Sequence, residues 1–246
     1  MAAWAWNCTT SGVAKRLPKH VVSNNISLIG LLALAALLPY LVAAGTCYLK
    51  FSIVFVMVRN AMGLQQVPSN LVLNAVALMM SLFVMLPVAQ KVYDYQRENP
   101  VDFSSLASVE SFVDNGLDAY RGYLRRYSDP ELVAFFEKIQ TARMEQQDAP
   151  QLEGEGRVSI FSLLPAYALS EIKHAFRIAF YLYLPFVVID LVISSILLAL
   201  GMMMMSPVVI SVPVKLILFV ALDGWSILSQ DLILQYIDLG KGVSGG

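Results

Sequence analysis

Hydrophobic stretches longer than a soluble core requires flank a polar middle in this chain. Residues 28–49 and 60–90 contain no charged side chain. A helix needs about 20 apolar residues to cross a hydrocarbon core of about 30 Å, so each stretch is long enough to span a membrane. Residues 178–189 and 191–214 form two further uncharged runs after the middle. The pattern therefore predicts four hydrophobic helices, two on each side of the polar middle.

Prolines and charged side chains interrupt these hydrophobic stretches. A proline inside a helix removes a backbone donor and bends the helix. A charge at the centre of a span costs about 2.5–3.5 kcal/mol on insertion scales. We therefore expect these helices to face protein or water over part of their length. The interrupting residues are Pro39, Pro87, Pro185, Pro207 and Pro213, together with Lys50, Arg59, Asp190, Lys215 and Asp223.

The polar middle, residues 91–158, has the pattern of amphipathic helices. Ser128 and Glu131 have the spacing of a capping box, and Pro130 suits the first helical turn. Apolar residues recur at helical spacing on both sides of the box, so we expect two helices whose apolar stripes face each other. Residues 147–157 indicate a flexible linker. The two stripes are Leu106, Val109, Phe112, Val113, Leu117, Tyr120 and Leu124, then Leu132, Phe135, Phe136 and Ile139.

The pattern divides the chain into five segments and predicts two turns. Gly63 and Pro68 punctuate a polar turn inside the first hairpin, and Ser69 can cap the helix that follows. The positive-inside rule leaves the topology open, because the basic N-terminal tail and Arg59 indicate opposite orientations. The segments are an extension of unassigned role (1–25), a first hydrophobic hairpin (26–90), the polar helical segment with its linker (91–158), a second hydrophobic hairpin (159–237) and a C-terminal tail (238–246).

Composition supports a membrane-associated helical protein and excludes several other classes. Of the 246 residues, 57% are hydrophobic and 14% are charged, whereas soluble domains carry about 25% charged residues. The net charge of −1 argues against a nucleic-acid binder, which needs basic side chains to neutralise phosphates. Cys8 and Cys47 are the two cysteines, so neither a disulfide framework nor a cysteine-rich metal site is expected.

The sequence contains no recognisable catalytic, cofactor-binding or metal-ligating motif. His20 and His174 are far apart and lack neighbouring ligand residues, and no phosphate-binding glycine loop is present. We therefore expect a protein that is not an enzyme and binds no cofactor or metal.

The acidic residues of the hydrophobic segments allow two interpretations. Asp190 and Asp223 could relay protons or ions in a transporter. Alternatively, acids and lysines on different helices pair, because buried charges need partners. We favour pairing, since the acids and bases of these segments nearly balance. The candidate partners are Lys50, Lys173 and Lys215 for Glu171, Asp190 and Asp223.

Four consecutive methionines, Met202, Met203, Met204 and Met205, lie between Gly201 and Pro207. Four residues in a row cannot all face one side of a helix, so the segment is predicted to form the turn of a hairpin. Such side chains could fill gaps in a core. They could also close a pore by excluding water, as hydrophobic gates do.

Four motifs resemble, in order and spacing, the SctR/FliP family of the type III secretion export apparatus. They are RNAMGLQQVPSN at 59–70, LLPAY at 163–167, the methionine segment at 201–207 and DGW at 223–225. The resemblance covers residues 26–237. The sequences at 63–66 and 205–207 are more similar to the virulence branch of the family than to the flagellar branch.

The resemblance implies an all-α fold of kinked, membrane-associated hairpins with a helical periplasmic middle, assembled into a helical ring. It implies a bacterial inner-membrane location, raised toward the periplasm, and a pentamer that associates with the S-type and T-type subunits. Unfolded secreted polypeptides would pass through this conduit, and a proton- or ion-coupled transporter is the alternative. Met202, Met203, Met204 and Met205 would form a pore gasket. Charges at subunit interfaces would be Lys50, Arg59, Glu171, Lys173, Asp190, Lys215 and Asp223.

Overall fold

The computed structural model describes residues 32, 36–37, 39–100, 108, 111–147, 158–202 and 204–237. The chain divides into two compact units, residues 1–41 and 42–246, and the elements named below belong to the second. The predicted extension 1–25, nearly all of the linker 147–157 and the tail 238–246 lie outside the described residues.

The described part of residues 42–246 consists of helices joined by turns and contains no strand, which confirms the all-α fold class. In chain order the elements are α2 (Tyr48–Ala61), α3 (Asn70–Glu98), the short π-helix η1 (Phe112–Gly116), α5 (Asp118–Tyr127), α6 (Pro130–Gln147), α7 (Ile160–Ala199), α8 (Pro207–Ala221) and α9 (Gly224–Ile237).

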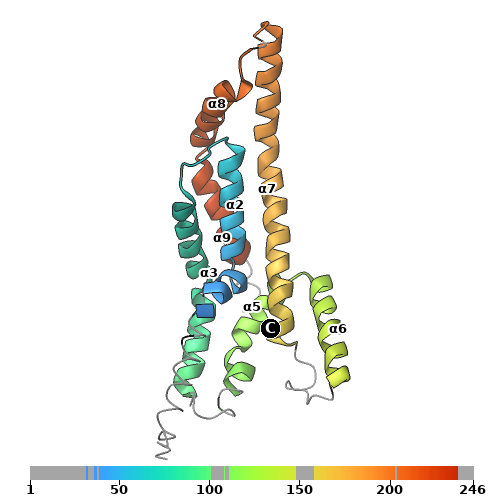
Figure 1. Ribbon diagram of the computed structural model, residues 1–246. Helices are drawn as coiled ribbons and strands as arrows, with labels where there is room; N and C mark the ends of the chain where they lie inside the picture. The colour runs from blue at the N-terminus through green and yellow to red at the C-terminus, as the bar shows by residue number, and fades with distance from the viewer. Residues whose placement is uncertain are drawn as a thin grey trace, which may run out of the picture. The chain divides into compact units, whose positions relative to one another are not determined.

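Helix α7 is the longest element, with 40 residues, and α2, α5, α6 and α8 all pack against it (Figure 1). The sequence predicted separate runs on either side of Asp190, but α7 continues through this residue. The reason is that Lys215 of α8 lies 2.6 Å from the Asp190 carboxylate, so the charge is matched without breaking the helix. Pro165 and Pro185 are also accommodated inside α7.

Helix α2 is the most enclosed helix of the second unit. Phe51, Val54, Phe55 and Val58 are fully buried or nearly so, between α3 and α7. These residues recur at helical spacing, so one face of α2 forms the centre of the core. Because protein surrounds α2, charged residues on it are shielded from lipid, as the interrupted hydrophobic pattern predicted.

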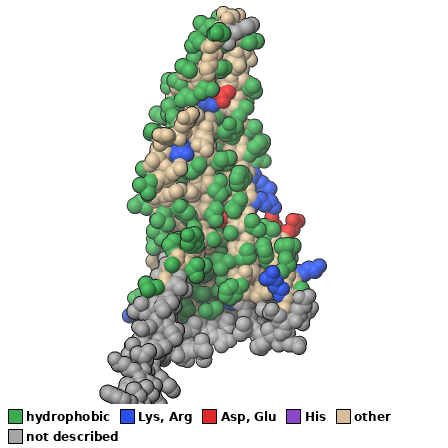
Figure 2. Space-filling model, viewed as in Figure 1, with side chains coloured by type: hydrophobic (Ala, Val, Ile, Leu, Met, Phe, Trp, Pro, Cys, Tyr) green, Lys and Arg blue, Asp and Glu red, His purple; other side chains and the backbone are tan. Residues whose placement is uncertain are grey.

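Within the described residues, two helices, α3 and α7, are long and apolar enough to cross a membrane. Two bent helix pairs would raise the number of candidate spans to four if each pair counts as one span. They are Pro39–Gly45 with α2, and α8 with α9, the latter bent by 59°. Hydrophobic side chains cover most of the face seen in Figure 2, including the upper region occupied by α7 and α8. The fold is therefore that of a membrane-associated helical protein.

Helices α5 and α6 do not form the predicted face-to-face pair. Both pack chiefly against the first half of α7, on either side of it (Figure 1). Leu124 of α5 and Val133 of α6 are buried in the core, whereas Phe135 and Ile139 remain exposed. The prediction was wrong because α7, whose N-terminal part is itself apolar, offers each stripe a larger surface than the short helices offer each other.

The cap of α6 is also shifted by one residue from the predicted capping box. The helix begins at Pro130, and Asp129 caps it by accepting a 3.1 Å hydrogen bond from the Glu131 backbone N–H. The Ser128 hydroxyl instead donates to the Leu124 carbonyl at the end of α5. Aspartate caps as well as serine does, and here its carboxylate also meets Lys173.

The polar turn between α2 and α3 forms where the sequence predicted it. Gly63 has a φ of 80° and ends α2, because its N–H donates to Asn60 and the Leu64 N–H donates to Arg59. This pair of bonds is a Schellman motif, which favours glycine at the residue after the cap. The Ser69 hydroxyl accepts a bond from the backbone N–H at the start of α3, so its predicted capping role is confirmed.

Candidate functional site: buried ion pairs and the methionine turn

A buried ion pair joins three helices that are distant in sequence. The Lys50 ammonium of α2 lies 3.2 Å from the Glu171 carboxylate of α7, and both side chains are almost completely buried. Tyr236 of α9 donates its hydroxyl to the same carboxylate, and Lys50 lies 4.5 Å from its ring centroid. A buried charge without a partner is strongly destabilising, so this cluster specifies how the three helices meet.

Tyrosines of α5 surround this cluster, and the sequence interpretation did not single them out as a group. The hydroxyls of Tyr123 and Tyr167 lie 2.6 Å apart, and Tyr127 donates to the Tyr236 carbonyl at 3.1 Å. Tyr120 donates to the Gly45 carbonyl at 2.9 Å. The spacing of three tyrosines over two turns of α5 was the available signal.

Burial raises the pKa of two of these tyrosines further above physiological pH. It raises the pKa of Tyr120 to about 12 and moves the pKa of Tyr123 well above its ordinary value. Burial disfavours the charged phenolate, so both hydroxyls keep the proton that each can donate. Both hydroxyls therefore remain neutral hydrogen-bonding groups at physiological pH.

A second ion pair lies toward the other end of α7. Lys215 of α8 is buried, and its ammonium lies 2.6 Å from Asp190 and 3.2 Å from the Ala61 carbonyl. Ala61 is the last residue of α2, where unpaired carbonyls carry partial negative charge. The single cation thus neutralises an acid and caps a helix at once, and it ties α8 to both α2 and α7.

The remaining predicted charges have other partners. Arg59 donates to the Pro68 carbonyl at 3.1 Å and to the Asn70 side chain at 2.6 Å, which clamps the turn between α2 and α3. Lys173 pairs with Asp129 at 2.5 Å. Asp223, which we expected to pair with a lysine, instead accepts a bond from the Ser226 hydroxyl at the start of α9. Contacts of these charges between subunits remain a prediction.

The ion pair that links the start of α6 to α7 lowers the pKa of Asp129, which lies outside the hydrophobic helices. The pKa of Asp129 lies below its usual range, first because Lys173 donates to its carboxylate and second because the Glu131 N–H does. Its backbone N–H also donates to the Ser170 hydroxyl at 2.7 Å. Asp129 therefore both caps α6 and attaches it to α7.

The methionine segment forms the predicted turn between α7 and α8. Gly201 has a φ of 75°, and a second Schellman motif ends α7 with bonds from Gly201 to Leu198 and from Met202 to Leu197. Helix α8 then begins at Pro207. The geometry required at the C-terminus of α7 explains why glycine precedes the methionines.

The methionines of this turn are exposed. Met202, Met204 and Met205 have exposed fractions of 47%, 101% and 44%, and Met203 lies outside the described residues. Within this chain the three do not fill a core, which removes the core-packing interpretation for them. The turn instead presents flexible apolar side chains at the junction of two helices.

The described residues hold no group of three or more His, Cys, Asp or Glu side chains placed to ligate a metal ion. Lys50, Glu171, Asp190 and Lys215 of the hydrophobic helices are instead arranged as ion pairs between elements. Comparison of the sequence with known proteins assigns the chain to a family. The sequence profile of the FliP family matches residues 31–232. The chain belongs to the FliP family.

Relatives from three bacteria support this assignment. The surface presentation of antigens protein SpaP of Salmonella typhi is 60% identical over 222 residues, which are 89% of this chain and 99% of that protein. The Yop proteins translocation protein R of Yersinia pestis is 45% identical over 87% of this chain and 97% of its own length. The harpin secretion protein HrcR of Erwinia amylovora is 36% identical over 82% of this chain and 92% of its own length.

These FliP-family matches confirm the resemblance to SctR/FliP proteins and to their virulence-type branch. Proteins of this family are structural components of the type III secretion export apparatus, and the chain is one of them.

Proposed function

We propose that this FliP-family protein is a pore-forming subunit of the export apparatus, several copies of which surround a path for unfolded polypeptides across the bacterial inner membrane. The observation that carries the proposal is the exposed methionine turn. Apolar side chains around a narrow path exclude water and block ions, as hydrophobic gates do. Thioether side chains also adapt to surfaces of different shape, so they could close around a moving chain of varied sequence.

The exposed apolar surface supports an assembled state. On α3, for example, Leu71, Met79 and Phe83 are all well exposed. Large exposed apolar surfaces mark contacts with protein or membrane. We propose that lipid covers part of this surface and that sister copies, together with the S-type and T-type subunits, cover the rest. The family resemblance suggests five copies, raised toward the periplasmic side.

The names of the relatives are consistent with export of proteins. The Yersinia relative is named for translocation of Yop proteins and the Erwinia relative for secretion of harpin. We extend the transport of protein substrates, though not these particular substrates, to this chain.

The transporter alternative receives less support from the two aspartates on which it depends. Asp190 is paired with Lys215, and Asp223 accepts a bond from Ser226 next to a helix start. Each carboxylate therefore has a structural partner, which an ion relay would have to displace during transport.

The gasket is tested by replacing Met202–Met205 with alanine. The assembled complex should then leak ions in its closed state, with a conductance about tenfold or more above background, because small side chains no longer exclude water. The measurement is single-channel recording of the complex in planar bilayers. Met79→Ala is the matched control, because Met79 is 73% exposed but lies on α3. Background conductance in the fully assembled alanine variant would contradict the gasket role.

A further inference from the structure

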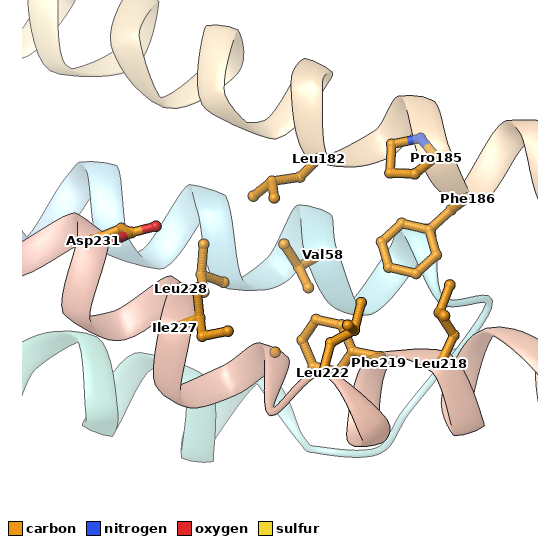
Figure 3. A pocket seen from close by; sticks show the side chains of 11 residues that line it. Val58, Leu182, Pro185, Phe186, Leu218, Phe219, Leu222, Ile227, Leu228 and Asp231 are labelled. Carbon is orange, nitrogen blue, oxygen red and sulfur yellow. The ribbon is translucent and has the colours of Figure 1, made fainter.

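An apolar pocket of about 250 Å³ lies between α2, α7, α8 and α9 (Figure 3). Val58 enters it from α2, Leu182 and Phe186 from α7, Phe219 from α8 and Leu228 from α9. Small-molecule sites usually measure about 300–1,000 Å³, so this pocket is closer in size to the seat of one or two side chains.

A single charged residue, Asp231, stands at one end of this pocket (Figure 3). It is exposed, and no ion pair or hydrogen bond engages its carboxylate within the described part of the chain. An ionisable side chain in a hydrophobic helix marks a functional contact and calls for an opposite charge. The pocket therefore suits a group with an apolar stem and a cationic end.

Arg177 of α7 is the matching cation. Lys50, Arg59, Lys173 and Lys215 all have partners within the chain. Arg177 is then the cation without an ion pair or hydrogen bond among the described residues of the two hydrophobic hairpins.

Arg177 faces away from the pocket of its own chain. Ala175 and Ala179, two residues before and after it, are both buried. Two residues turn an α-helix through about 200°, so Arg177 projects from the opposite face of α7. Phe180 and Tyr181, three and four residues later, are exposed beside it. Arginine and tyrosine are enriched among the residues that dominate binding at protein interfaces.

The two unmatched charges lie at about the same level. Glu171 of α7 contacts Tyr236 of α9. From this contact, Arg177 is about 9 Å further along α7 and Asp231 is about 8 Å back along α9, at 1.5 Å per residue. Leu182, further along α7, and Asp231 both line the pocket, so the two distances run in the same direction. Where copies repeat around an axis that runs along the helices with a small rise per copy, groups at similar levels come within reach of each other in neighbouring copies.

We propose that Arg177 of one copy enters the pocket of the next copy and pairs with its Asp231. The aliphatic part of the arginine lies against the apolar walls while the guanidinium meets the carboxylate. The contact joins two different faces of the chain, which is the kind of interface that builds rings and helical assemblies. This inference rests on the proposed function, because it assigns a contact within the assembly proposed there.

Charge exchange tests the pairing. Asp231→Arg and Arg177→Asp each place like charges together, so each should lower the fraction of chain in the large detergent-extracted complex about tenfold or more. The double variant should restore that fraction to within about twofold. Lys138→Asp on exposed α6 is the control for charge reversal alone. Single variants that assemble normally, or a double variant no better than either, would overturn the pairing.

Chemical cross-linking between copies provides the second test. One tagged copy carries Asp231→Cys and a differently tagged copy carries Arg177→Cys, both with Cys8→Ser. A bismaleimide linker should join the two tags only when both cysteines are present, because an extended arginine paired with an aspartate holds the two Cα atoms farther apart than the roughly 7 Å that a disulfide can bridge. Leu191→Cys in place of Arg177→Cys is the control, because Leu191 is exposed on α7 but about 21 Å further along it. A complex of full size without this cross-link would contradict the pairing alone, whereas a chain that never assembles would contradict the proposed function.

Discussion

Lys50 and Glu171 illustrate, at the scale of single residues, how charges persist in helices that are otherwise hydrophobic. Their ion pair is buried, and the Tyr236 hydroxyl supplies a further hydrogen bond to the carboxylate. The desolvation of both groups offsets much of their attraction. The pair therefore contributes less to net stability than to the choice of one arrangement of α2, α7 and α9.

Removing one member of the pair should cost more than removing both. Lys50→Met leaves the Glu171 carboxylate buried without a cation, so we expect the free energy of unfolding to fall by about 3–5 kcal/mol. The double variant Lys50→Met with Glu171→Leu should recover most of this loss. Unfolding in mixed detergent, followed by circular dichroism, provides the measurement. Equal losses in the single and double variants would be inconsistent with this explanation.

The sequence identified the charged residues but not which partner each of them contacts. Three lysines and three acids were candidate partners, and the Lys50–Glu171 pair followed the expected type of contact. Asp223 did not, because a position next to the first turn of α9 let it accept from Ser226 instead. The Tyr120, Tyr123 and Tyr127 hydroxyls were missed, since helical spacing predicts which face is apolar and not where a polar tip finds its partner.

Helix ends were the most predictable features at the scale of elements. Gly63 and Gly201 both follow a helix end, and a positive φ is required at both positions. By contrast, the path of α7 through Asp190 depends on Lys215, which is 25 residues away in sequence. The packing of α5 and α6 on α7 likewise depends on the whole surface of α7. The spacing of apolar residues within α5 and α6 carries no information about that surface.

The attachment of α6 to α7 should weaken in acid. The pKa of Asp129 is depressed in the folded protein, so its contribution is complete above the unfolded value of about 3.9 and is lost as pH falls through the folded value. Hydrogen exchange of α6, corrected for intrinsic rates, should therefore show protection falling below about pH 4. Asp129→Asn should lower protection at neutral pH and flatten its pH dependence. An unchanged pH profile in this variant would assign the effect to other groups.

At the scale of the whole molecule, the hydrophobic pattern predicted the class of protein, and the assembly remains a proposal. Among the helices that the structure describes, only α3 and α7 are long and apolar enough to span a membrane singly, and the other candidates are bent pairs. Ion pairs account for Lys50, Glu171, Asp190 and Lys215, but the large exposed apolar surface requires something outside the chain to cover it.

The size of the extracted protein should separate the two proposed functions. Co-expressed with the neighbouring apparatus subunits, the chain should elute from size exclusion as one discrete complex several times its own 27.1 kDa. Multi-angle light scattering combined with ultraviolet and refractive-index detection separates the mass of the protein from that of the bound detergent. A chain that remains monomeric under these conditions would favour the transporter.

The length of α7 has a consequence for where its two ends lie. Forty residues at 1.5 Å each give a rod of about 60 Å, twice the hydrocarbon thickness of about 30 Å. Fitting it inside a bilayer would require a tilt near 60°, whereas spanning helices tilt by about 0–40°. The tyrosine cluster near one end and the methionines at the other therefore cannot both lie at lipid depth. At least one of them is therefore surrounded by protein or water and not by the bilayer.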